Sequence, residues 1–283
     1  MDSRILRIYP YRRVSLTATM SREGFFHTER MERIMLLDQI GAYWDDRADG
    51  YSLTIHEQLK GDTAQQFRLL FRRIAPKGGN LSCLDAGCGP GFFSILLSQA
   101  GHHVTSMDYS PEMLKRTQAN LREAGFEPNT VQGDVQSLPF ADESFHFIVS
   151  RDCVWCLEHP ERAYAEWLRV LKPGGRIFVS DGNYYLYHYS ESYRKERLLR
   201  EKLAQARGES ASHPTYGVDP TRINEIAKDL PLSKLERPRW DIDTLDVLGY
   251  RNIQFQTDGH LFADPDTGEK YLHNGHFLIW GEK

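Results

Sequence analysis

Residues 81–95, LSCLDAGCGPGFFSI, decide the fold of this chain. An apolar run ends at Asp85, three glycines follow at alternate positions, and a helix-like apolar pattern begins directly after them. A buried strand that leads through a glycine turn into a helix is typical of nucleotide-binding α/β folds, because the turn brings backbone N–H groups close to the ligand. The stretch therefore predicts a nucleotide site, and the question it leaves is which nucleotide binds there.

The glycine spacing disfavours the two commonest nucleotide loops. Dinucleotide-binding turns carry G-x-G-x-x-G, in which the third glycine lets the helix pack closely on the strand. The glycines here are Gly87, Gly89 and Gly91, and Phe92 occupies the position where that third glycine would stand. A phosphate-binding loop would need Gly-Lys-Ser/Thr, which is absent from this stretch. A NAD-dependent oxidoreductase therefore stays only as an alternative.

Acidic residues end the next two predicted strands. Asp108 follows Gly87 at the distance that suits a carboxylate accepting hydrogen bonds from ribose hydroxyls. Asp134 ends the third strand, where a carboxylate can accept from an adenine amino group while the next backbone N–H meets a ring nitrogen. A NAD site needs no such third acid. The two acids together favour an adenosine ligand of another kind.

The chain from about residue 63 alternates strand and helix signals. This rhythm predicts an α/β fold with a Rossmann-like, mostly parallel sheet of seven strands and helices on both faces. We expect strands at 81–86, 102–108, 129–134, 144–150, 176–182, 252–258 and 275–282. We expect helices at 63–75, 91–100, 111–125, 160–171, 190–207 and 218–230.

The 283 residues carry a formal net charge of −4. This balance gives no global basic field to attract nucleic acid or an anionic membrane, so we expect neither as a partner. The sequence has no run of 18 apolar residues, and its first 20 residues lack a continuous apolar core, which predicts neither a transmembrane helix nor a signal peptide. The four cysteines predict reduced thiols and a cytoplasmic location.

Four ordered segments resemble the class I S-adenosylmethionine-dependent methyltransferases, particularly the small-molecule branch. The segments are LDAGCGPG (84–91), VTSMDYSPEML (104–114), GDVQSLPFADESFHFIVS (133–150) and AEWLRVLKPGGRIFVSD (165–181). The resemblance implies S-adenosyl-L-methionine as cofactor and S-adenosyl-L-homocysteine as its product. It also implies a methyl transfer to a small organic acceptor through an O, N, S or C nucleophile.

The resemblance assigns cofactor contacts to the glycine turn and the strand ends. The implied residues are Asp85, Gly87, Cys88 and Gly89 on the methionine side, Asp108 on the ribose, Tyr109 and Met113 against the adenine, Asp134 and Val135 at the adenine edge, and Ser150 and Arg151 near the amino-acid end. Related enzymes close the site with an aromatic residue from an N-terminal helix, so Tyr43 and Tyr51 are expected to touch cofactor or acceptor.

The strand and helix pattern divides the chain into three parts. Residues 1–62 would form an N-terminal arm and helical cap, and residues 63–182 with 241–283 the cofactor-binding core. Residues 183–240 interrupt the strand–helix rhythm, and because long loops in compact domains are uncommon and usually functional, we expect a helical lid that binds the acceptor.

Methyl transfer needs a base only if the nucleophile arrives protonated. His188 is the first candidate because it follows the fifth strand, near the expected methyl group, and His56 and His213 are further candidates. Asp152 and Tyr184 complete the predicted catalytic residues. We predict no metal site, since CVWC (153–156) lacks further zinc ligands at suitable spacing.

The acceptor leaves alternatives open. Methyltransferases that act on nucleic-acid or protein amino groups often carry Asn/Asp-Pro-Pro-Tyr/Phe after the fourth strand, where this chain has Arg151-Asp152-Cys153-Val154. A tRNA, rRNA or protein methyltransferase is therefore the second interpretation. A non-catalytic module that binds the cofactor without turnover is a third.

Overall fold

The computed structural model describes residues 22–208, 215–257, 260–263, 268, 270–273 and 275–283. The arm at 1–21 and His213 lie outside the described residues. The chain divides into two compact units, 1–35 and 36–283, and the sheet and the candidate site belong to the second. Helix α1 (Arg22–Lys60) begins in the first unit and ends in the second.

A seven-stranded sheet with the order β3-β2-β1-β4-β5-β9-β6 forms the centre of the second unit. Its strands are β1 (Ser82–Ala86), β2 (His103–Asp108), β3 (Thr130–Gln132), β4 (Phe145–Arg151), β5 (Leu171–Gly182), β6 (Arg251–Thr257) and β9 (His276–Glu282). The first five strands are parallel, and β9 runs antiparallel to both of its neighbours. All seven predicted strands are confirmed.

A second sheet was not predicted from the sequence. It pairs β7 (His260–Ala263) with β8 (Lys270–His273) in antiparallel fashion, between β6 and β9 in the chain. Helix α8 (Arg239–Leu248) was also missed, and the expected boundary at residue 240 falls inside it.

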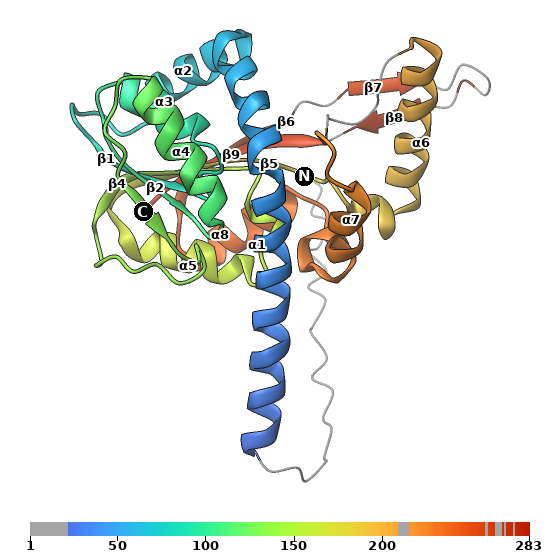
Figure 1. The fold of residues 1–283 in the computed structure, drawn as a ribbon, viewed down its shortest axis with the longest axis horizontal. Coiled ribbons are helices and arrows are strands. Elements are labelled where there is room, and N and C mark those ends of the chain that lie inside the picture. The colour runs from blue at the N-terminus through green and yellow to red at the C-terminus, as the bar shows by residue number, and fades with distance from the viewer. Residues whose placement is uncertain (1–21, 209–214, 258–259, 264–267, 269, 274) are drawn as a thin grey trace, which may run out of the picture. The chain divides into compact units, whose positions relative to one another are not determined.

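Helices cover both faces of the central sheet (Figure 1). The helices on the central sheet are α2 (Asp62–Ile74), α3 (Phe92–Gln99), α4 (Pro111–Glu123), α5 (Pro160–Val170) and α8. Helix α6 (Glu191–Ala206) lies beside β7 and β8, and α7 (Pro220–Asp229) packs with α1. The short 3₁₀ helices are η1 (Val154–Cys156), η2 (Leu186–His188) and η3 (Pro231–Lys234). Ser110 begins α4, because its hydroxyl accepts the Met113 N–H at 3.0 Å and Pro111 fits the first helical position.

Alternating side chains divide the core into two apolar clusters. Phe147 and Phe178 of the sheet pack with Phe71 of α2 and Phe93 of α3 on one face. Trp167 of α5 belongs to the other cluster, together with buried strand residues such as Leu84 and Ile148 and with α8. Since parallel strands are buried on both sides, their near-continuous apolar runs follow directly from this layering.

Among the described helices, none combines the length and the hydropathy that a membrane crossing requires. The four cysteines are free thiols. Within the described part of the chain, no cluster of His, Cys, Asp and Glu side chains is suited to hold a metal ion.

Candidate functional site

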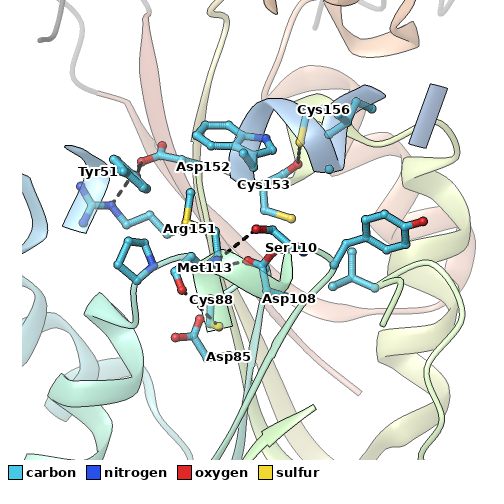
Figure 2. A pocket seen from close by; sticks show the side chains of 18 of the residues that line it. Tyr51, Asp85, Cys88, Asp108, Ser110, Met113, Arg151, Asp152, Cys153 and Cys156 are labelled. Carbon is cyan, nitrogen blue, oxygen red and sulfur yellow. Dashed lines mark hydrogen bonds and ion pairs between the residues drawn. The ribbon is translucent and has the colours of Figure 1, made fainter. Parts of the chain in front are cut away.

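A cavity lies where β1, β2 and β4 end, beneath α1 (Figure 2). It encloses about 850 Å³, counting its open mouth. Ligands of open α/β sheets bind at the carboxyl ends of the strands, so this cavity occupies the position that the fold prepares for a ligand.

Contacts with α4 and the turn before it hold α1 over the cavity. The Ser110 hydroxyl donates to Asp45 of α1, and the Tyr109 hydroxyl donates to Asp38 Oδ1 at 2.8 Å. Residues of α1 therefore form one wall of the cavity, opposite the glycine turn.

The glycine turn gives the cavity its closest backbone approach. Gly87 has a φ of 72° and Gly89 a φ of 50°, in the left-handed region that favours glycine. A Cβ on Gly87 would lie 2.3 Å from the Cys153 sulfur, so no larger residue fits there. The glycines are therefore required by the turn and by the packing of the segment after β4.

Asp108 ties the end of β2 to the glycine turn. Its Oδ2 accepts the Gly89 N–H at 2.8 Å and its Oδ1 accepts the Ser110 N–H at 2.9 Å. Burial raises the pKa of this carboxyl to about 6. The Tyr109 backbone also donates to this carboxylate, which offers about four acceptor positions, so about one remains for a ligand.

Asp85 is buried at the end of β1. Its Oδ2 accepts the Ser94 hydroxyl at 2.6 Å, and the Ser94 oxygen lies 2.7 Å from that of Ser106. Burial is the main cause that raises the pKa of Asp85, to about 7. Its carboxyl therefore gains a proton more easily than an exposed aspartate does.

Arg151 brings a positive charge to the cavity. Its guanidinium lies over the Phe92 ring, 4.5 Å from the ring centroid, and its Nε is 3.3 Å from Asp152 Oδ2. Its Nη1 is buried without a hydrogen-bond partner among the described residues. Since a buried unsatisfied donor is costly, this nitrogen is a candidate partner for an anionic ligand group.

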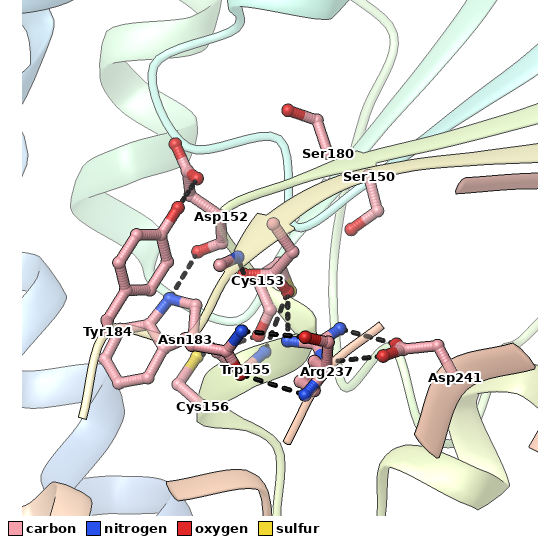
Figure 3. Close-up of polar contacts among 12 residues, drawn as sticks. Ser150, Asp152, Cys153, Trp155, Cys156, Ser180, Asn183, Tyr184, Arg237 and Asp241 are labelled. Atoms are coloured by element: carbon pink, nitrogen blue, oxygen red, sulfur yellow. Dashed lines mark hydrogen bonds and ion pairs between the residues drawn. The ribbon is translucent and has the colours of Figure 1, made fainter. Parts of the chain in front are cut away.

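Asp152 has the left-handed φ of 52°, which is uncommon for a residue with a side chain. Its backbone N–H donates to the Ser180 carbonyl at 2.9 Å, and its carbonyl accepts the Trp155 Nε1–H at 2.9 Å. Its carboxylate accepts the hydroxyls of Tyr51 and Tyr184 (Figures 2 and 3). Backbone strain of this kind clusters at functional sites, so the Asp152 carboxylate is a candidate functional group.

Residues 84–179 match the protein family described as "Methyltransferase domain". A demethylmenaquinone methyltransferase from Renibacterium salmoninarum is 30% identical over 179 residues, which are 63% of this chain and 73% of that enzyme. The chain belongs to the class I S-adenosylmethionine-dependent methyltransferases. This methyltransferase also matches a malonyl-[acyl-carrier protein] O-methyltransferase from Erwinia billingiae, with 44% identity over 98 residues that cover 34% of the chain and only 37% of that enzyme.

Solved structures agree with the methyltransferase fold. A complex from Haloferax volcanii of a methyltransferase with the activator Trm112 matches 84% of this chain and 96% of the solved one, with a TM-score of 0.54 and 17% identity. A structure described as a methyltransferase from Bacillus halodurans C-125 has a TM-score of 0.51 and 17% identity, and covers 76% of this chain and 98% of its own. At such identities the likeness concerns the fold alone.

Most of the residues that were predicted to contact the cofactor line the cavity of this methyltransferase. The lining includes Tyr51, Asp85, Gly87, Cys88, Gly89, Asp108, Tyr109, Met113, Asp134, Val135 and Arg151. Tyr43 and Ser150 do not line it. Tyr43 packs with the apolar residues of α7, and the fully buried Ser150 donates its hydroxyl to the Ala86 carbonyl at 2.8 Å.

The predicted catalytic residues are separated. Asp152 lines the cavity. Tyr184 does not line it, but its hydroxyl donates a hydrogen bond to the Asp152 carboxylate. His188 does not reach the cavity, because its Nε2 lies 3.1 Å from Asn224 Oδ1 and its ring stacks on Tyr185. His56 is likewise not among the lining residues.

Several lining residues were missed by sequence reasoning. From α1 they are Leu37, Ile40, Gly41, Trp44 and Ile55, which with Tyr51 follow helical spacing and could have been found as one apolar stripe. Cys153 and Cys156 were predicted as ordinary buried or pocket thiols, and both line the cavity. His276 of β9 places its Nε2 4.0 Å from Asp152 Oδ1, a tertiary contact without a local signal.

Proposed function

We propose that the cavity beneath α1 binds S-adenosylmethionine and directs its methyl group to a small organic acceptor. The observation that carries this proposal is the buried Arg151 Nη1, which has no hydrogen-bond partner among the described residues and belongs to a residue that lines the same cavity as the glycine turn. A carboxylate is the group that satisfies such a donor best. S-adenosylmethionine carries a carboxylate and no phosphate.

The residues present fit the other parts of the cofactor. The remaining acceptor capacity of Asp108 suits a ribose hydroxyl. Asp134 Oδ1 accepts from the Gln136 backbone and side chain at 2.9 Å, which leaves Oδ2 for the adenine amino group. The positive φ of Gly87 and Gly89 lets the backbone approach the methionine part without a Cβ in the way.

The bound cofactor supplies a methyl group that is already activated on a sulfonium. The chain therefore has to orient donor and acceptor in line and keep water out. We assign water exclusion to Ile40 and Trp44 of α1, which cover the cavity. Asp152 is the group that can hold or accept a proton of the acceptor, with Tyr184 as its positioning partner.

A small acceptor agrees with the enclosure by α1 and with the acidic lining. The relatives named above methylate demethylmenaquinone and malonyl-[acyl-carrier protein], which supports a metabolic acceptor. We propose that residues 183–240 contribute to its enclosure, because Tyr184 contacts Asp152 and α7 packs against α1. RNA is not favoured by a cavity whose lining holds four carboxylates and one guanidinium.

The test is methyl transfer from S-adenosylmethionine labelled on the methyl group. The protein is incubated with a cell extract freed of macromolecules or with total RNA. We expect the label in the small-molecule fraction, and its loss in Arg151→Met. Asp243→Asn, at an exposed ion pair on α8, should retain transfer. Label in RNA alone would overturn the acceptor, and absence of cofactor binding would overturn the assignment of the cavity.

A further inference from the structure

We infer that the acceptor is an amine, whose protonated nitrogen binds Asp152 beside the aromatic rings of Trp44 and Tyr51. This inference rests on the proposed function and names the acceptor class for the same site. It follows from the hydrogen bonds of Asp152, from the charge of the cavity and from four aromatic residues near Asp152. We call these residues, Trp44, Tyr51, Trp155 and Tyr184, the aromatic frame.

Four aromatic rings from three separate segments meet around Asp152. Trp44 of α1 lies 5.9 Å from Tyr51 and 6.4 Å from Trp155 between ring centroids, and Trp155 lies 5.8 Å from Tyr184. Three of these residues donate hydrogen bonds to Asp152. The Tyr51 and Tyr184 hydroxyls donate to its carboxylate, and the Trp155 indole N–H donates to its backbone carbonyl. Trp44 and Tyr51 line the cavity together with Asp152, whereas Trp155 and Tyr184 do not, so two aromatic rings and a carboxylate are available there to an organic cation.

The carboxylate of Asp152 keeps capacity for a further donor. Tyr51, Tyr184 and the Arg151 Nε use three of its roughly four acceptor positions. Burial, first among the causes, raises the pKa of both tyrosines, so both stay neutral donors. One position is therefore left for an N–H of the acceptor.

The charged groups of the cavity favour the same class. Asp85, Asp108, Asp134 and Asp152 line it, against the single cation Arg151. His276 is the other basic group that faces Asp152, at 4.0 Å. If the cofactor's carboxylate occupies Arg151 Nη1, that guanidinium no longer balances Asp152. At Asp152 itself, a carboxylate or phosphate acceptor would then meet a like charge, while an ammonium would be attracted.

The chemistry of the step follows from this placement. The ammonium transfers one proton to the Asp152 carboxylate, and the freed nitrogen lone pair forms the new N–C bond to the methyl group. The S–C bond of the donor breaks with its electron pair on sulfur, which leaves a neutral thioether. The methylated amine keeps the positive charge, so charge and atoms balance.

Figure 2 shows Asp152 well away from Asp85, with Asp108 also on the far side of Arg151. The two carboxylates near the glycine turn are thus distinct from the one we assign to the acceptor. A change at Asp152 can therefore alter acceptor binding while the cofactor product still binds, which makes the two proposals separable.

The test uses three ligands of one shape and different charge: phenethylamine, 2-phenylethanol and 3-phenylpropionate. Binding is measured by calorimetry to the full chain saturated with S-adenosylhomocysteine. We expect phenethylamine to bind at least about tenfold more tightly than the alcohol, and the carboxylate least. In Asp152→Asn, where asparagine tolerates the left-handed φ, the amine should lose that preference while S-adenosylhomocysteine still binds and saturates the protein.

The outcomes separate the proposals. Asp243→Asn is the control and should bind as the wild type does, because its carboxylate is exposed and away from the cavity. Equal binding of amine and alcohol, a preference that survives in Asp152→Asn, or no binding of any of the three at millimolar concentration would overturn the amine inference. Failure of S-adenosylhomocysteine itself to bind would instead overturn the proposed function.

Discussion

The backbone N–H of Gly89 donates a hydrogen bond of 2.8 Å to Asp108 Oδ2. This bond joins two separate parts of the sequence, the glycine turn after β1 and the acid that ends β2. The turn is thereby fixed before any ligand binds, and the carboxylate is held at the edge of the cavity with acceptor capacity to spare. The proposed cofactor site is preorganised by contacts within the protein.

Asp85 should make stability depend on pH. Burial raises its pKa from 3.8 to about 7, so the folded state holds this proton more tightly than the unfolded state does. Stability from this group is therefore present at low pH and is lost as pH rises through about 7. Relative to Asp85→Asn, which is neutral throughout, the wild type should lose unfolding free energy between pH 5 and pH 8. Urea titrations of both proteins measure it, and a constant difference across this range would contradict the assignment.

Arg151→Met should weaken only ligands that carry the amino-acid part. The lost hydrogen bonds to a charged group correspond to about 1.5–3 kcal/mol of S-adenosylhomocysteine binding free energy. Methylthioadenosine lacks the carboxylate, so its affinity should change little. Calorimetry with both ligands measures the difference. An equal loss for both would show that the substitution disturbs the cavity in general.

Arg237 holds a buried ion network beside the cavity (Figure 3). Its guanidinium contacts Asp241 at 2.7 Å and Asp181 at 2.9 Å, and all three side chains are inaccessible to solvent. Asp181 also accepts the Trp155 N–H at 3.0 Å, which links the network to the aromatic frame. Arg237→Ala should lower the unfolding free energy by about 3–5 kcal/mol, because it leaves buried carboxylates uncompensated.

The matched control for this substitution is Arg239→Ala. Arg239 pairs with Asp243 at 2.9 Å, but both side chains are exposed. Such a pair contributes about 0–1 kcal/mol, so urea titration should give a change of that size or less. Equal effects of the two substitutions would argue against a structural role for the buried network.

Local signals predicted the sheet and one side of the site. The glycine turn and the acids Asp108 and Asp134 follow apolar strands, and parallel topology brings such strand ends to one edge. Strand alternation and proline-marked helix starts, as at Pro111, were equally local. These features were predictable because neighbours in the sequence determine them.

Tertiary contacts explain the rest. His188 was expected near the methyl group because it follows β5, but it lies in the short helix η2, where its ring faces Asn224 and Tyr185. Trp155 lies within CVWC (153–156), and its neighbours in the sequence give no signal of its position beside the site. The Trp155 ring contacts the rings of Trp44 and Tyr184, which are distant from it in the sequence. No local sequence pattern predicts such contacts.

The most direct test of the central claim is the binding free energy of S-adenosylhomocysteine to the wild type and to Asp108→Ala, measured by calorimetry. We predict a loss of about 1.5–3 kcal/mol, since Asp108 would no longer accept a ribose hydroxyl. The 2′,3′-dideoxy form of the ligand controls for disturbance of the glycine turn, and it should bind both proteins alike. An unchanged affinity for S-adenosylhomocysteine, or an equal loss for the dideoxy form, would contradict the assignment of this cavity to the cofactor.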